Sequence, residues 1–92
     1  MTPVEQLRVA LDAATGALAG DGAPRATLER PKQAGHGDYA TNAALVLAPV
    51  LRRSPRDVAQ DLQGELEQRL GGVLERSEVA GPGFLNLFLA DA

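Results

Sequence analysis

The spacing of the apolar residues changes in the last quarter of this chain, and that change limits the folds open to it. In the main patterned segments before Gly71–Gly72, apolar residues recur every three or four positions, as they do along one side of an amphipathic helix. From Gly81 onward, in GPGFLNLFL, they follow the two-residue period of a strand. A chain of 92 residues is long enough for one small domain. We therefore expect a single α+β domain over residues 1–92, with about three helices packed on one face of a short antiparallel sheet.

Two helices have clear start signals. A Thr-x-x-Glu capping box at residues 2–5 predicts a first helix that ends near Gly20. Ser54, followed by a proline, predicts another helix that begins at residue 55 and ends at the Gly71–Gly72 pair. Each region has one apolar stripe at helical spacing, so each helix is expected to bury one side against the rest of the domain.

A middle helix is predicted by the apolar run from Ala43 to Leu51. Either Thr41 or Asp38 has a side chain suited to cap its start. Pro49 lies inside the run and lacks the backbone N–H that a helix uses, so we expect a kink or a break there.

Three strands are expected from the remaining segments. The first is a short one at 26–30, and the other two, at 73–80 and 84–89, form an antiparallel hairpin around a tight turn. The turn consists of Gly81, Pro82 and Gly83. The predicted order is therefore helix, strand, loop, helix, helix, strand, strand.

The last predicted strand has two unlike faces. Alternation places leucines 85, 87 and 89 on one face and Phe84, Asn86 and Phe88 on the other. If the leucines pack on the helices, the second face points away from them. Single-stranded RNA is recognised by this kind of surface, since unstacked bases gain about 1–3 kcal/mol each on an aromatic ring and an amide reads base edges. The alternative is a second small core, with Asn86 bonded to the backbone.

Composition excludes several kinds of site. The chain has no cysteine, one histidine and scattered acidic residues, so we expect neither a metal site nor catalytic residues. It also lacks an apolar run that could cross a bilayer and a signal-peptide pattern, which predicts a cytoplasmic protein without a membrane partner. A net charge of −3 argues against binding nucleic acid by general electrostatics. The basic residues nevertheless gather between residues 25 and 56, as either a phosphate-facing patch or ordinary solvated surface: Arg25, Arg30, Lys32, Arg52, Arg53 and Arg56.

The glycine-flanked pair His36 and Asp38 has two readings. In the structural one, both side chains hydrogen-bond the backbone and order the entry to the middle helix. In the other, they contact a ligand, as they would in a small enzyme centred on this pair. The segment does not match a phosphate-binding loop, because it lacks the Gly-Lys-Ser/Thr ending.

Three segments together resemble a known family. HGDYATNAALVLA (36–48), SPRDVAQDL (54–62) and EVAGPGFLNLFL (78–89) are similar, in order and spacing, to the N-terminal additional domain of arginyl-tRNA synthetases, which are class I enzymes. The resemblance covers nearly the whole chain and is weakest in the first helix and in residues 19–30. It implies a domain that docks beside the catalytic domain and contacts the D-loop of tRNA(Arg).

The resemblance also implies roles for individual residues. Phe84 would stack on a D-loop nucleotide and Asn86 would hydrogen-bond it, with Phe88 on the same face. Separately from the resemblance, the basic residues Arg25, Arg30 and Lys32 are expected to meet nearby phosphates, although the sequence does not place them near this face. The remaining motif residues would be structural: His36, Gly37, Asp38, Tyr39, Thr41, Asn42, Gly81, Pro82 and Gly83.

The catalytic signatures of that family, His-x-Gly-His and Lys-Met-Ser-Lys, do not occur in this sequence. The resemblance therefore implies a part of an arginine–tRNA ligase that binds no cofactor itself, with ATP and Mg²⁺ expected only in a catalytic domain outside this chain. A free-standing relative is the alternative. A further alternative for function is a protein-interaction or self-association module that uses the Phe84 and Phe88 face.

Overall fold

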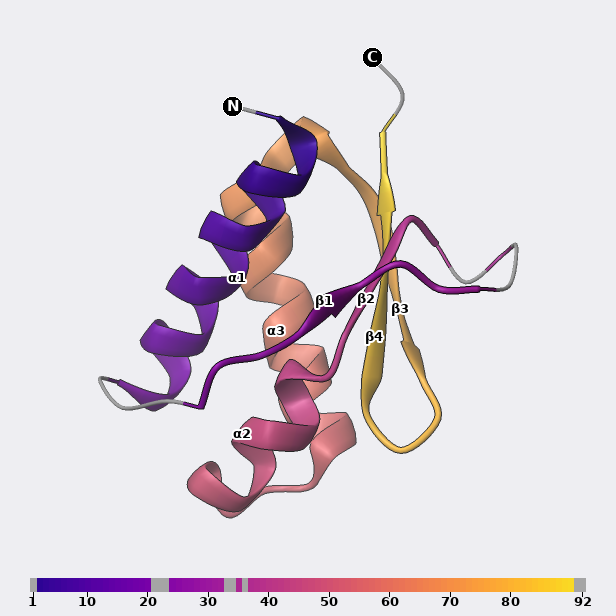
Figure 1. Ribbon diagram of the computed structural model, residues 1–92. Helices are drawn as coiled ribbons and strands as arrows, with labels where there is room; N and C mark the ends of the chain where they lie inside the picture. Colours follow the sequence, from indigo (N-terminus) through magenta and orange to yellow (C-terminus); the bar gives the residue numbers. More distant parts are fainter. Residues whose placement is uncertain (1, 21–23, 33–34, 36, 91–92) are drawn as a thin grey trace.

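The computed structural model of the protein describes residues 2–20, 24–32, 35 and 37–90. In this part of the chain, three helices lie together on one side of a four-stranded antiparallel sheet (Figure 1). This arrangement confirms the expected α+β fold. The elements are α1 (Pro3–Ala19), β1 (Leu28–Glu29), β2 (Tyr39–Thr41), α2 (Ala43–Leu51), α3 (Pro55–Leu70), the 3-10 turn η1 (Gly71–Val73), β3 (Leu74–Ala80) and β4 (Phe84–Leu89).

The helices α1 and α3 begin and end where their sequence signals predict. At the start of α1, the Thr2 hydroxyl accepts a hydrogen bond from the Glu5 N–H at 3.2 Å, and the Glu5 carboxylate accepts one from the Thr2 N–H. The Ser54 hydroxyl accepts from the Asp57 N–H at 3.2 Å in the same way before α3. These bonds satisfy backbone donors that a helix start leaves without partners.

The helix α2 differs from the prediction in two ways. Asn42, rather than the expected Thr41 or Asp38, occupies the N-cap position, and it makes no side-chain capping bond. The Thr41 hydroxyl nevertheless accepts from the N–H of Ala43, the first helical residue, at 3.1 Å, so Thr41 satisfies one backbone donor of the helix start. The helix also does not break at Pro49 but runs on to Leu51. Because Pro49 lies in the last turn, its missing N–H removes a single bond of the helix ladder.

The sheet has the strand order β1-β2-β4-β3, and all neighbouring strands are antiparallel. The predicted hairpin of β3 and β4 is confirmed, although β3 begins one residue later than expected. The strand β2 was not predicted from the sequence. It is three residues long, follows a glycine-rich segment and shows no usable alternation, so only its pairing with β4 reveals it.

The core lies between the helices and the sheet. The α1 and α3 stripes are buried there, except for Val4, which is exposed, and Leu18, which is partly buried. From β4, Leu85 and Leu87 are fully buried and Leu89 is partly buried, as their shared face predicts. Phe84 and Phe88 are not among the residues of this core.

Candidate nucleic-acid interface

The strand β4 lies in the middle of the sheet and presents its second face away from the helices. Residues directly opposite each other in antiparallel strands point to the same side of a sheet, and the pairings of β4 place Ala40 of β2 and Glu78 of β3 beside Asn86. The same register places Ala80 opposite Phe84 and Arg76 opposite Phe88. We call the resulting set the outer face; its members are Glu29, Ala40, Arg76, Glu78, Ala80, Phe84, Asn86 and Phe88.

Phe84 is the open aromatic residue of the outer face. The residue is 43% exposed, although it follows a turn and begins a central strand. Its cross-strand neighbour is Ala80, whose methyl group covers little of the ring. A second core under the two phenylalanines is therefore absent at this end of the face, and one ring is available for contact.

The turn before Phe84 is held from both sides. Arg56, in the first turn of α3, donates a hydrogen bond to the Gly81 carbonyl at 2.6 Å, and the Gly83 N–H donates to the Ala80 carbonyl at 3.3 Å. A Cβ atom at Gly83 would lie 2.6 Å from the Cβ of Pro55, so only glycine fits this close approach to α3. The position of Phe84 is thus set by contacts of the turn as well as by the sheet.

Asn86 is mostly covered, with 8% of the residue exposed. The strands β2 and β3 flank it on both sides, and the two phenylalanines lie above and below it along β4. Its amide forms no hydrogen bond with a described residue, yet no buried side-chain nitrogen or oxygen in the described ranges lacks a partner. The amide atoms of Asn86 therefore keep some contact with solvent, and their donor and acceptor are not used within the described residues.

Phe88 is half-buried and differs from Phe84 in having a cation over its ring. The guanidinium carbon of Arg76 lies 3.9 Å from the ring centroid, within the range of a cation–π contact. The Arg76 Nε also donates to the Glu78 carboxylate at 3.0 Å. The face predicted from alternation is thus uneven, with an open ring at Phe84, a recessed amide at Asn86 and a covered ring at Phe88.

The three basic residues expected at phosphates do not lie together on this face. The Arg30 guanidinium is 5.6 Å from the ring centroid of Tyr39, which is opposite Leu87 and so belongs to the helix-facing side. Arg25 and Lys32 are exposed on the two segments that flank β1. None of the three belongs to the row of residues that the sheet register aligns on the outer face.

Two other arginines of the basic middle segment are engaged within the chain. Arg53 pairs with Asp61, and this hydrogen bond, together with the charge of Asp61, raises the pKa of Arg53. Arg56 is bonded to the hairpin turn, as described above. Sequence reasoning missed the Arg56 contact because its acceptor is a backbone carbonyl 25 residues away.

The glycine-flanked motif binds the backbone of β4. The Asp38 N–H donates to the Leu87 carbonyl at 2.9 Å, and the Asp38 carboxylate accepts from the Leu89 N–H at 2.8 Å. Gly37 has a φ of +89°, and a Cβ atom there would lie 2.7 Å from the Leu87 oxygen. These contacts match the structural reading of Asp38, although its partner is a strand rather than the helix entry. His36 lies outside the described residues.

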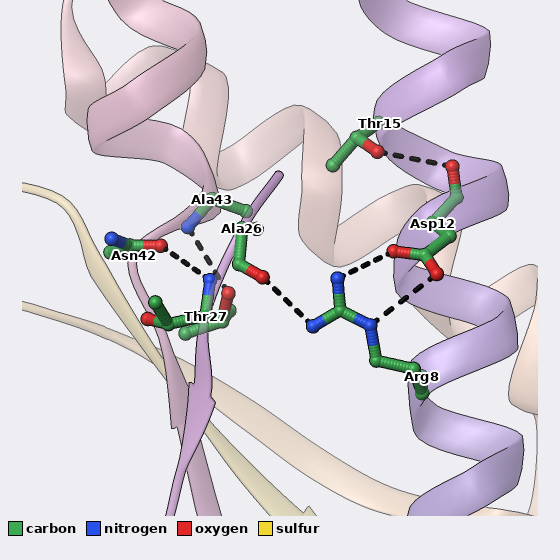
Figure 2. A network of polar contacts seen from close by, with 8 residues as sticks. Arg8, Asp12, Thr15, Ala26, Thr27, Asn42 and Ala43 are labelled. Atoms are coloured by element: carbon green, nitrogen blue, oxygen red, sulfur yellow. Dashed lines mark hydrogen bonds and ion pairs between the residues drawn. The ribbon is translucent and has the colours of Figure 1, made fainter. Parts of the chain in front are cut away.

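Asn42 extends this set of contacts to the segment before β1. Its Oδ1 accepts a hydrogen bond from the Thr27 N–H at 2.9 Å, while the Arg8 Nη1 donates to the Ala26 carbonyl at 2.8 Å from the other side (Figure 2). Arg8 is itself paired with Asp12 one helical turn along α1. The residues 26 and 27 are thus held between α1 and the start of α2.

Two other kinds of feature are absent from the described part of the chain. It contains no group of three or more His, Cys, Asp or Glu side chains that could hold a metal ion. Within the same ranges, no helix has the length and apolarity needed to cross a membrane. The outer face is therefore the surface that we consider for function.

Comparison with known proteins gives a consistent picture. The family described as arginyl tRNA synthetase N terminal domain matches residues 5–89. The chain is 47% identical over 96 residues to an arginine–tRNA ligase of Frankia alni, a match that covers 98% of this chain and 17% of that protein. It is 42% identical over 85 residues to arginine–tRNA ligase 1 of Halalkalibacterium halodurans, covering 92% of this chain and 15% of the relative.

A solved structure agrees with these sequence relatives. The arginyl-tRNA synthetase of Thermus thermophilus matches with a TM-score of 0.71 and 28% identity, over 94% of this chain and 14% of that one. The chain thus spans about 15% of the length of such relatives. Because the family match extends over nearly all of the sequence, this chain belongs to the arginyl-tRNA synthetase N-terminal domain family.

Proposed function

We propose that this chain is a tRNA-binding accessory domain of an arginyl-tRNA synthetase, and that its outer face contacts the D-loop at the elbow of tRNA(Arg). The observation that carries the proposal is that Phe84 is 43% exposed on a sheet face that no described helix covers. An open ring on such a face suits an unstacked base. Membership of the family indicates which nucleic acid the partner is, since the relatives are named as arginine–tRNA ligases.

Phe84 and Asn86 have complementary parts in this contact. A base stacks on the Phe84 ring, and its edge meets the Asn86 amide two residues along the strand, about 6.6 Å away at the usual strand rise. The small side chains of Ala80 and Ala40 leave room on either side of this path. Asn86 is recessed, so it hydrogen-bonds a base that enters between its neighbours rather than one that lies flat across the sheet.

The domain contributes affinity and orientation to the reaction. In the proposed assembly it docks beside a catalytic domain, which holds ATP and Mg²⁺ and joins arginine to the acceptor end. Fixing the elbow of the tRNA limits the positions that the distant acceptor end can take, and this raises the rate by lowering the entropy lost at the transition state. The 92-residue chain is given no catalytic residue in this proposal.

The test is a titration of the isotope-labelled chain with tRNA(Arg), followed by NMR. Phe84→Ala is expected to weaken binding roughly 5- to 150-fold, the equivalent of the 1–3 kcal/mol that one stacked base gains. Val50→Ala is the matched control, because Val50 is also an exposed apolar residue, 52% exposed, but lies on α2. It should bind as the unchanged chain does.

A second arm identifies the partner nucleotide. The bases of the D-loop are removed one at a time, and removal of one of them should weaken binding of tRNA by the unchanged chain. The affinity of the Phe84→Ala variant should not change when that same base is removed. Absence of tRNA-induced shifts at low salt, with the fold intact, would overturn the proposal. Sedimentation tests the alternative of self-association: a mass that rises with concentration and falls in Phe88→Ser would favour an interaction module instead.

A further inference from the structure

We propose that Arg76 is a phosphate contact on the outer face, and that it exchanges its ion pair with Glu78 for a phosphate of the bound RNA. The inference rests on the proposed function and adds a charged contact to the stacked one. In this exchange the guanidinium stays stacked on Phe88 while its hydrogen-bond partner changes.

The geometry keeps the guanidinium of Arg76 in place and leaves it open. Its carbon lies 3.9 Å from the Phe88 ring centroid, and its Nε is 3.0 Å from a Glu78 carboxylate oxygen. The side chains of Arg76 and Glu78 are 54% and 51% exposed. Among the described residues, no acceptor takes a hydrogen bond from the two terminal nitrogens of Arg76. A planar group with two free donors on one edge suits a phosphate, which accepts two parallel bonds.

Arg76 carries the positive charge of an outer face that also holds two carboxylates. Glu29 and Glu78 lie at opposite ends of the row that contains Asn86, so two carboxylates face any RNA backbone that crosses the sheet. Arg76 is the basic member of the outer face as defined above. A cation on this face reduces that repulsion, and Arg76 is the side chain in position to supply it.

The distance along β4 distinguishes this contact from base recognition. Arg76 is opposite Phe88, four residues from Phe84, which is about 13 Å at the usual strand rise. A base stacked on Phe84 is too small to reach that far. Arg76 therefore meets the sugar–phosphate backbone that leads to or from the stacked nucleotide.

A purely structural role for the pair makes different predictions. The strand β3 is at the edge of the sheet, and charged residues on an edge strand discourage pairing with other chains. Such a role would affect association or stability, whereas a phosphate contact changes how binding depends on salt. The measurement is therefore the dissociation constant for tRNA(Arg) at several salt concentrations, with Arg76→Gln, Arg76→Lys and Phe84→Ala compared.

We expect Arg76→Gln to weaken binding several-fold at low salt and to reduce the slope of log affinity against log salt by about 0.7–0.9. Arg76→Lys keeps the charge and should keep the slope. Phe84→Ala should weaken binding with the slope unchanged, because stacking releases no counterion. If Arg76→Gln retains both the affinity and the slope while Phe84→Ala binds weakly, the inference is wrong and the proposed function stands. If neither variant differs from the unchanged chain, the proposed function is wrong as well.

Glu78→Gln tests the exchange of partners. Removing this carboxylate frees Arg76, so the affinity for tRNA should rise by more than it does in Glu29→Gln, which removes an equal charge from the other end of the same row. In an Arg76→Gln background the two effects should become equal. Equal effects of Glu78→Gln and Glu29→Gln in the unchanged chain would show that Glu78 does not compete with phosphate for Arg76.

Discussion

Replacing Gly37 by alanine tests whether the glycine-flanked motif serves to hold β4. Gly35 offers a matched control, since its φ of +90° is nearly that of Gly37, at +89°. An added Cβ meets nothing within 4 Å at Gly35, whereas at Gly37 it lies 2.7 Å from the Leu87 carbonyl oxygen. The two substitutions therefore share the cost of a left-handed backbone and differ in the collision with β4.

The size of the difference follows from these contacts. The left-handed conformation costs a non-glycine residue roughly 1–2 kcal/mol in either variant. At Gly37 the backbone must also shift away from Leu87, which weakens the neighbouring bond from the Asp38 N–H to the Leu87 carbonyl, at 2.9 Å. Loss of one such bond costs about 0.5–1.5 kcal/mol. We expect Gly37→Ala to lower the free energy of unfolding by about 1.5–3.5 kcal/mol and Gly35→Ala by about 1–2 kcal/mol.

Urea unfolding followed by circular dichroism measures both values. With a slope of about 1 kcal/mol per molar urea for a small domain, the two midpoints should differ by about 0.5–1.5 M. The gain from stiffening the unfolded chain is the same for both substitutions, so it cancels in the comparison. Equal midpoints would show that the approach of Gly37 to β4 does not stabilise the domain, and would refute the structural account of the motif.

Three further predictions concern stability and use the same urea assay. Asp38→Ala removes the acceptor of the Leu89 N–H at a solvent-exposed position and should cost about 1 kcal/mol; a midpoint equal to that of the unchanged chain would contradict the contact. Ser54→Ala removes the cap of α3 and should cost about 1 kcal/mol, whereas Ser54→Asp, which can cap, should retain most of the stability. Gly64→Ala should instead raise the unfolding free energy by about 0.5–1 kcal/mol, because Gly64 lies in the interior of α3 and an added Cβ would meet nothing within 4 Å. A lower urea midpoint would contradict the open space at this position.

Local signals account for the parts of the fold that sequence reasoning predicted. The caps at Thr2 and Ser54 act through backbone groups three residues away, and the hairpin follows from a turn between two strand-like segments. The chain needs no distant partner to form these features, so their residues can be read one segment at a time. This is why α1, α3, β3 and β4 lie close to their predicted positions.

The features that were missed depend on partners far away in the sequence. The strand β2 exists because Tyr39, Ala40 and Thr41 pair with β4, more than 40 residues later. Alternation identified the face that holds Phe84 and Asn86, but the 8% exposure of Asn86 depends on strands that flank it on both sides. The RNA contacts assigned to these residues stay a prediction until binding is measured.

Arg76 shows the same limit more sharply. Its place over the Phe88 ring depends on the register of β3 against β4, which includes an irregularity between residues 74 and 76. A bulge shifts the side chains that follow it, so alternation counted along β3 does not by itself show which of them share a face with Phe88.

The central position of β4 has a consequence for how this domain can change. The strand holds core leucines on one face and the proposed RNA contacts on the other, so a slip of one residue in its pairing would exchange the two sets. Leu85 and Leu87 would then meet water, while Asn86 would enter the core. An insertion or deletion in the three-residue turn at 81–83 that slips this pairing should therefore destabilise the fold, whatever its effect on RNA binding. The packing of the core leucines therefore also fixes the register that places the proposed RNA contacts on the outer face.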